Sequence, residues 1–184
     1  MAKALDAPGA TVTAAWRRLS PLPAGKWLFS LMVGRTAPYT GTIGARVEAF
    51  GGGHAIVRLR ERRAIRNHLN SIHAVALANL GEMTSGLAMM SAMPAGVRGI
   101  PIVLSIEYLK KARGTLTAET RTTLPAIVAE TDHEVVAHIR DEAGDEVARC
   151  TVRWRLAPPR DAAGAPGRAD AGVAGDARTA AVRP

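Results

Sequence analysis

NHLNSIHAVALANLGEMTSGLAMM, residues 67–90, is the stretch that decides the fold. Apolar side chains recur along it at intervals of three and four residues, which predicts a helix with one buried stripe. The remaining positions are mostly small, so we expect the helix to be enclosed closely on several sides. Ser71, with Asn70 before it, is the expected N-cap. The stripe consists of Ile72, Ala76, Leu80, Met83, Leu87 and Met90.

Segments on both sides of this helix alternate apolar and polar residues, as half-buried strands do. A helical segment over 12–33, interrupted by Pro21 and Pro23, precedes them. The strands are expected at 40–50, 54–62, 101–109, 114–123, 133–140 and 148–156. Such short connections suit an antiparallel sheet, and one long apolar helix must be covered by it. The sequence therefore predicts an α+β fold in which an antiparallel β-sheet wraps a long central helix, with an N-terminal helical segment.

The length of 184 residues suits one domain. We place it at 12–156, between a flexible N-terminus at 1–11 and a disordered tail at 157–184 that is rich in Ala, Gly, Pro and Arg. The net charge is +8, and the tail contributes +1 through four Arg and three Asp, so +7 lies on the folded part. This charge favours an anionic partner: nucleic acid, acidic lipid or a phosphorylated small molecule.

The composition also disfavours several classes of protein. The single Cys150 excludes an internal disulfide and a cysteine-cluster metal site, and it is compatible with a reducing compartment. The histidines lack metal-ligand spacing, so we expect no metal and no cofactor. Neither a signal peptide nor a membrane span is apparent, and we expect a cytoplasmic protein. Two Phe, two Tyr and three Trp are scattered along the chain, which disfavours nucleic-acid binding.

Glu82 is the only Asp, Glu, Lys or Arg between Arg66 and Arg98. Burial of a lone carboxylate raises its pKa and prepares it to act as a general base or a nucleophile. The alternative is a solvated charge on the exposed side of the helix. An exposed side normally carries several charges, however, so the isolation of Glu82 favours the first interpretation.

Chemistry at Glu82 would also need donors that face a developing oxyanion. The start of the helix offers free backbone N–H groups near His73 and Ala74, at the positive end of the helix dipole. Ala74 and Glu82 are eight residues apart, roughly 12 Å along a helix axis. One carbonyl group cannot contact both within a single chain. Catalysis by these groups therefore requires a symmetric dimer with antiparallel helices.

The segments APYTGTIGARVEAF (37–50) and RNHLNSIHAVALANLGE (66–82) resemble the hotdog superfamily, in which an antiparallel sheet wraps a long helix. The resemblance covers about residues 12–156 and is closest to acyl-CoA thioesterases of the phenylacetate-degradation (PaaI-like) type. More narrowly, both segments are similar to a hotdog branch known as a domain of unknown function.

In those thioesterases the site is an Asn, a His six residues later that precedes a Gly, and an acid nine residues after the His. Asn67, His73 and Glu82 keep this spacing, and Ala74 stands where Gly is usual. The resemblance implies that Asn67, supported by His73, holds the thioester carbonyl while the Ala74 N–H polarises it. Glu82 of the other chain would activate water or attack directly. Pro101 stands where many of these enzymes carry Ser or Thr.

Two basic clusters are candidates for substrate binding. The resemblance implies that residues after the first strand beyond the helix contact the phosphates of coenzyme A, although a solvated turn is the alternative. These residues are Lys110, Lys111 and Arg113. The other cluster, RLRERRAIR (58–66), alternates like a solvated strand face, and Arg66 beside Asn67 is its expected ligand contact. His68 either lines the site or stabilises its loop.

The sequence therefore predicts a hydrolase of an acyl-CoA or a related acyl thioester, in which coenzyme A belongs to the substrate. We expect a homodimer or a tetramer. The alternative is a non-catalytic acyl-CoA or acyl-lipid binding protein of the same fold, which Ala74 and Pro101 favour. A hotdog hydratase fits less well, because that chemistry uses an Asp and a His presented together, whereas here the acid is a distant Glu.

Overall fold

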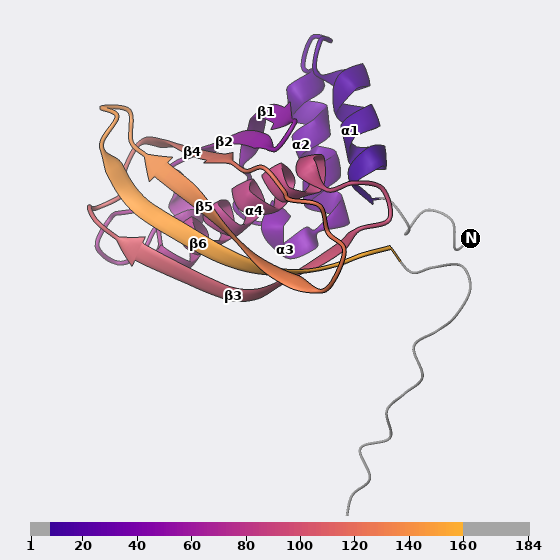
Figure 1. Ribbon diagram of the computed structural model, residues 1–184. Helices are drawn as coiled ribbons and strands as arrows, with labels where there is room; N and C mark the ends of the chain where they lie inside the picture. Colours follow the sequence, from indigo (N-terminus) through magenta and orange to yellow (C-terminus); the bar gives the residue numbers. More distant parts are fainter. Residues whose placement is uncertain (1–7, 160–184) are drawn as a thin grey trace, which may run out of the picture.

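The structure is a computed structural model that describes residues 8–159 (Figure 1). Three helices come first: α1 (Pro8–Leu19), α2 (Gly25–Thr36) and α3 (Pro38–Gly41). They are followed by β1 (Arg46–Gly51), β2 (His54–Arg60), the 3-10 turn η1 (Arg63–Ile65) and α4 (Ala74–Ala92). Four strands complete the described part: β3 (Arg98–Tyr108), β4 (Thr115–Arg121), β5 (Thr131–Arg140) and β6 (Glu146–Ala157). The predicted order of elements is confirmed.

All six strands form one antiparallel sheet in the order β1-β2-β4-β5-β6-β3. Figure 1 shows this sheet curving around α4, with α1 and α2 beside β1. The fold therefore has two layers, the sheet and α4, because a helix that is buried on several sides needs a sheet that bends around it. The predicted α+β class with a wrapped central helix is therefore confirmed.

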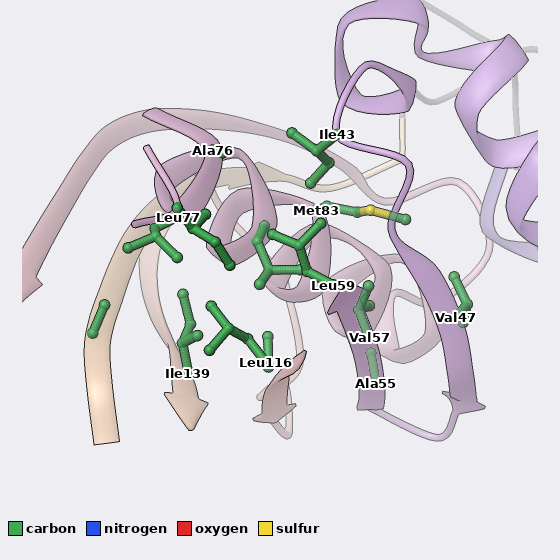
Figure 2. Close-up of a cluster of buried hydrophobic side chains, with 14 of the residues drawn as sticks. Ile43, Val47, Ala55, Val57, Leu59, Ala76, Leu77, Met83, Leu116 and Ile139 are labelled. Atoms are coloured by element: carbon green, nitrogen blue, oxygen red, sulfur yellow. The ribbon is translucent and has the colours of Figure 1, made fainter. Parts of the chain in front are cut away.

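The core lies between α4 and the concave face of the sheet (Figure 2). Alternate residues of β2, β4 and β5 point inward, among them Leu59, Leu116 and Ile139. They meet Leu77 and Leu80 of α4, which are also buried. Each fully buried side chain of this size contributes about 1.5–3 kcal/mol. This core fixes the rotation of α4 and thus decides which of its residues face away from the sheet.

Aromatic side chains attach the N-terminal helices to the sheet. Trp16 of α1 and Phe29 of α2 pack edge to face, with ring centroids 4.9 Å apart. Phe50 of β1 lies 5.7 Å from Phe29. The predicted interruption by Pro21 and Pro23 is confirmed, since α1 ends at Leu19 and α2 begins at Gly25.

The first strand begins later than the sequence predicts. The sequence suggested a strand over 40–50, but β1 begins at Arg46 and residues 38–41 form α3. Pro38 explains the difference, because its fixed φ and missing N–H suit the first turn of a helix. At the N-terminus, α1 already begins at Pro8, inside the segment 1–11 that was expected to be flexible. Residues 160–184, most of the predicted tail, lie outside the described residues.

β3 is an edge strand, and none of its residues is buried. It pairs only with β6 and has little contact with α4. Apolar side chains are exposed on both of its faces, for example Val103 and Leu104. A long, uncovered, apolar edge is unusual because its unpaired N–H and C=O groups invite pairing with another strand. β3 therefore has the properties of an interface.

Candidate functional site

Asn67 organises the loop that precedes α4. Its Oδ1 accepts hydrogen bonds from the backbone N–H of Leu69 (2.9 Å), the N–H of Ser71 (3.2 Å) and the Ser71 hydroxyl (3.1 Å). Three donors around one oxygen fix the orientation of the amide, since Nδ2 cannot accept them. The Nδ2 group has no acceptor within the described residues. It is therefore a free donor on a well-held loop.

Neighbouring segments hold the same loop from outside. The Ile72 N–H donates to the Ala112 carbonyl and the His73 N–H donates to the Ile65 carbonyl, both at 2.8 Å. Arg113 Nε donates to the carbonyl of Asn70, whose φ of 52° is left-handed. Arg113, predicted to bind phosphate, thus contacts the site loop directly.

The N-cap of α4 is His73, so the predicted cap at Ser71 is wrong. His73 Nδ1 accepts from the Val75 N–H at 3.1 Å. The Ser71 hydroxyl is instead directed to Asn67. Among residues 8–159 the Ala74 N–H has no acceptor. A free N–H at the positive end of a 19-residue helix is suited to an anion or a polarised carbonyl.

Glu82 lies two turns further along α4 and is half-buried. Burial raises the pKa of its carboxyl group above the ordinary value of 4.5. Its carboxylate forms no hydrogen bond or ion pair in the described part of the chain. Gly86 leaves room beside it, because a Cβ there would lie 3.9 Å from Glu82 Oε1. A desolvated, unpaired carboxylate with space beside it is the arrangement expected of a general base.

Trp154 of β6 also borders this space. Its Cζ2 would lie 3.6 Å from the same Cβ at Gly86. The side chain is 6% exposed, and its Nε1 has no hydrogen-bond partner among the described residues. The position of Trp154 near Glu82 was not predicted from the sequence. Nothing local in the sequence indicates it, because the contact depends on how β6 packs against α4.

Cys150, four residues before Trp154 on the same face of β6, is buried and free. Burial, together with the nearby Glu82 carboxylate, raises the pKa of its thiol to about 11. The thiol is therefore protonated at neutral pH and serves as a small apolar group.

The two halves of the predicted site lie apart within one chain. Asn67 and Ala74 are at the start of α4, and Glu82 is eight residues beyond Ala74 on the same continuous helix. That spacing corresponds to about 12 Å along the axis. Tyr108, which the sequence did not single out, joins the first half to β3, since its hydroxyl donates to the Ala74 carbonyl at 3.2 Å.

The predicted substrate-binding residues differ in their surroundings. Lys110 Nζ bridges Asp141 (2.8 Å) and Asp145 (2.6 Å) in the turn between β5 and β6, so a phosphate would compete with two carboxylates. Arg66 pairs with Glu61, which also accepts from the Gly114 N–H at 2.6 Å. Two further predicted contacts, His68 and Lys111, are both exposed.

Two classes of feature are missing from residues 8–159. No group of three or more His, Cys, Asp and Glu side chains is placed to hold a metal ion. No helix in this range is long and apolar enough to cross a membrane.

Comparisons with known proteins place the chain in a family. The model of the domain of unknown function DUF4442 matches residues 25–156. No curated protein matches the chain. The structural-genomics protein APC5556 is 27% identical, with a TM-score of 0.69 over 80% of this chain and 98% of its own.

Two further solved structures are more distant. A Pseudomonas aeruginosa protein of unknown function, called a probable thioesterase, is 20% identical, with a TM-score of 0.64 over 74% of this chain and 96% of its own. A hypothetical thioesterase from Streptococcus pneumoniae, solved with coenzyme A, is 21% identical, with a TM-score of 0.57 over 70% of this chain and 99% of its own. At these identities the likeness is one of fold. With a family model that matches from α2 to the end of β6 and a sheet wrapped around α4, the chain belongs to the DUF4442 family and has the hotdog fold.

Proposed function

We propose that this protein is a homodimeric hydrolase of acyl-CoA or a related acyl thioester. The observation that carries the proposal is the separation of Glu82 from Ala74 along α4 and from Asn67 in the loop before it, together with the uncovered edge strand β3. Solved relatives of the same fold include proteins called thioesterases, one of them crystallised with coenzyme A. The net charge of +8 suits a substrate that carries several phosphates.

Pairing of β3 with β3 of a second copy would complete the site. Two edge strands related by a twofold axis pair antiparallel and extend the sheet across both subunits. The edge N–H and C=O groups of β3 would then be paired, and its apolar side chains on the face toward the helices would be covered. The two α4 helices would run side by side in opposite directions, so that Glu82 of each faces Asn67 and Ala74 of the other. A tetramer, which the sequence also allows, would consist of two such dimers.

The chemistry follows from the groups that would then surround a thioester. The carbonyl oxygen accepts from Asn67 Nδ2 and from the Ala74 N–H, which stabilise the negative charge that develops on it. The Glu82 carboxylate takes a proton from water as the water oxygen bonds to the acyl carbon. The C–S bond then breaks, the thiolate takes the proton from Glu82, and a carboxylic acid and a thiol leave. His73 contributes by fixing the first turn of α4 through the Val75 N–H.

A non-catalytic acyl-CoA binding protein is the second candidate. Pro101 favours it, because this residue lies on β3 opposite Trp154 and has no hydroxyl to assist hydrolysis. Ala74 in place of Gly adds a methyl group where the carbonyl would bind.

A hydrolysis screen over acyl-CoA substrates of varied chain length decides between the two candidates. We expect turnover that falls by about a hundredfold or more in Glu82→Gln, while the fold and the dimer persist. Glu134→Gln is the matched control, because Glu134 is an exposed carboxylate on β5. Tight acyl-CoA binding without turnover, equal in wild type and Glu82→Gln, would establish the binding protein instead.

A further inference from the structure

A cavity of about 900 Å³ lies at the β1 edge of the sheet, between α2, α3 and the strands β1 and β2. This edge is opposite the β3 edge, and Glu82, Asn67 and Trp154 are not among the residues that line the cavity. Its volume is within the range of small-molecule pockets, roughly 300–1,000 Å³. The cavity is therefore large enough for a ligand of its own.

One wall of the cavity is apolar. Trp27 and Leu31 lie one turn apart on α2 and both line it, with exposed fractions of 54% and 37%. The face of α2 that carries Phe29 already packs in the core, so Trp27 and Leu31 form a second apolar face. Met83 of α4 also lines the cavity, which thus extends to the central helix. Large apolar side chains around a concave space are typical of sites for alkyl chains.

Another part of the lining is basic. Arg58 and Arg60 project from β2 on the face away from α4, because they alternate with buried residues. Arg46 of β1 is the direct cross-strand partner of Arg58. Like charges placed opposite each other destabilise a sheet, and an anion beside Arg58 would relieve the part of this repulsion that Glu48, the partner of Arg46, leaves.

The acidic residue in this lining is already neutralised. Glu48 pairs with Lys26 (3.3 Å) and with Arg46 (3.2 Å). Within residues 8–159 neither Arg58 nor Arg60 has a carboxylate partner. The wall therefore offers cationic donors without an internal anion.

We propose that this cavity binds a single-chain amphiphile with an anionic head group. The head group, a carboxylate or a phosphate, contacts Arg58 and Arg60, and the alkyl chain lies against Trp27 and Leu31. Charge-assisted hydrogen bonds to arginine hold such heads firmly. This site is independent of the proposed hydrolase site and needs no turnover.

Calorimetric titration of the full chain tests the proposal with four probes that each have ten carbons in the acyl or alkyl chain, each kept below its solubility limit and its micelle concentration. Decanoate and decyl phosphate carry the two candidate heads, and decanol and decyltrimethylammonium are the neutral and cationic controls. We expect saturable binding, at a stoichiometry of one per chain, for at least one anionic probe and none for the two controls. The better of the two anions identifies the head group.

Two pairs of variants locate the site. Arg58→Gln with Arg60→Gln should weaken binding at least about tenfold, whereas Arg153→Gln, on β6 and paired with Glu134, should leave it unchanged. Leu31→Gln should weaken binding about threefold or more. Val128→Gln, at a residue that is 86% exposed, is its control. Circular dichroism confirms that each variant folds.

Three results would overturn the proposal. Equal binding of all four probes would mean unspecific apolar adsorption. Acetate or inorganic phosphate binding as tightly as the decyl probes would mean an anion site without an alkyl site. Absence of binding, with a concentration-dependent oligomer that Leu31→Gln dissociates, would assign the cavity to a second copy of the chain.

Discussion

Gly81 of α4 lies directly against Cys150 of β6: a Cβ at position 81 would be 2.3 Å from Cys150 Cβ and 2.7 Å from its Sγ. Real Cβ atoms do not approach this closely, so only glycine permits the helix to lie at this distance from the strand. The contact also places Glu82, the next residue, beside β6. The position of Glu82, the candidate base, thus depends on the absence of a side chain at position 81.

Replacement of Gly81 by alanine should destabilise the protein by about 2 kcal/mol, because overpacking exceeds the gain in helix propensity. Denaturant unfolding measures this change. Gly86→Ala is the matched control, since its Cβ would lie at an ordinary 3.6 Å from Trp154. It should stabilise the protein by about 0.5–1 kcal/mol.

A double-mutant cycle tests whether the contact with Cys150 causes the destabilisation by Gly81→Ala. Cys150→Gly removes the side chain that the new methyl group at position 81 would meet, so the double variant should be more stable than the sum of the two single changes. If the changes in unfolding free energy of the two single variants simply add, the effect of Gly81→Ala does not come from this contact.

Local pattern explains why much of the fold could be predicted. The period of three to four residues in α4 and the alternation in β6 come from burial on one face or several, which the sequence records directly. The start of β1 could not be read this way, because Thr40 and Ile43 favour strands while Pro38 begins a helical turn. The cap of α4 was misplaced for a related reason, since Ser71 is a good N-cap residue whose hydroxyl bonds to Asn67 instead.

Only part of the candidate site leaves a pattern in the sequence. The spacing of Asn67, His73 and Glu82 can be read directly from the sequence, and the isolation of Glu82 predicts the raised pKa of its carboxyl group. The proximity of Trp154 to Glu82 cannot be read from the sequence. It follows from the register of β6 against α4, which is fixed by contacts between residues about 70 positions apart. Long-range packing of this kind leaves no local pattern.

Glu82→Gln should stabilise the protein at neutral pH. Burial raises the pKa of Glu82 in the folded state above the unfolded value of 4.5, so the folded state binds more protons between the two values. The stability of the wild type therefore falls as pH rises through this window, and the Gln variant avoids the loss. Unfolding midpoints over a pH series check this.

The difference between Glu82→Gln and wild type should disappear below the unfolded pKa of Glu82, where both carry a neutral side chain. Glu134→Gln, at an exposed position on β5, is measured alongside as the control for loss of a carboxylate. A Gln variant that is less stable than wild type at neutral pH would mean that a partner stabilises the Glu82 carboxylate.

Thr120→Val should stabilise the protein by about 1 kcal/mol, because it removes a buried hydroxyl without a partner. Thr120 is 1% exposed, and its Oγ1 lacks a hydrogen bond in the described part of the chain. Thr84→Val is the matched control: its equally buried hydroxyl donates to the Leu80 carbonyl at 2.7 Å. That variant should lose about 1 kcal/mol. Equal effects in thermal unfolding would contradict the assignment of the Thr120 hydroxyl as unpaired.

Asn67→Asp should separate the two roles of the Asn67 amide. The aspartate keeps an oxygen for the three donors of Leu69 and Ser71, so the loop and the stability should be preserved. It loses the Nδ2 donor and places a negative charge where the thioester carbonyl becomes an oxyanion. Turnover should therefore fall by about a hundredfold or more.

Ser71→Ala is the complementary change, because it removes one of the three donors to Oδ1 and leaves Nδ2 in place. It should lower stability by about 1 kcal/mol and retain most of the activity. Steady-state hydrolysis and unfolding, measured on both variants, give opposite patterns if Nδ2 binds the carbonyl. Full activity in Asn67→Asp would assign Asn67 to the loop alone and leave the Ala74 N–H as the donor to the oxyanion.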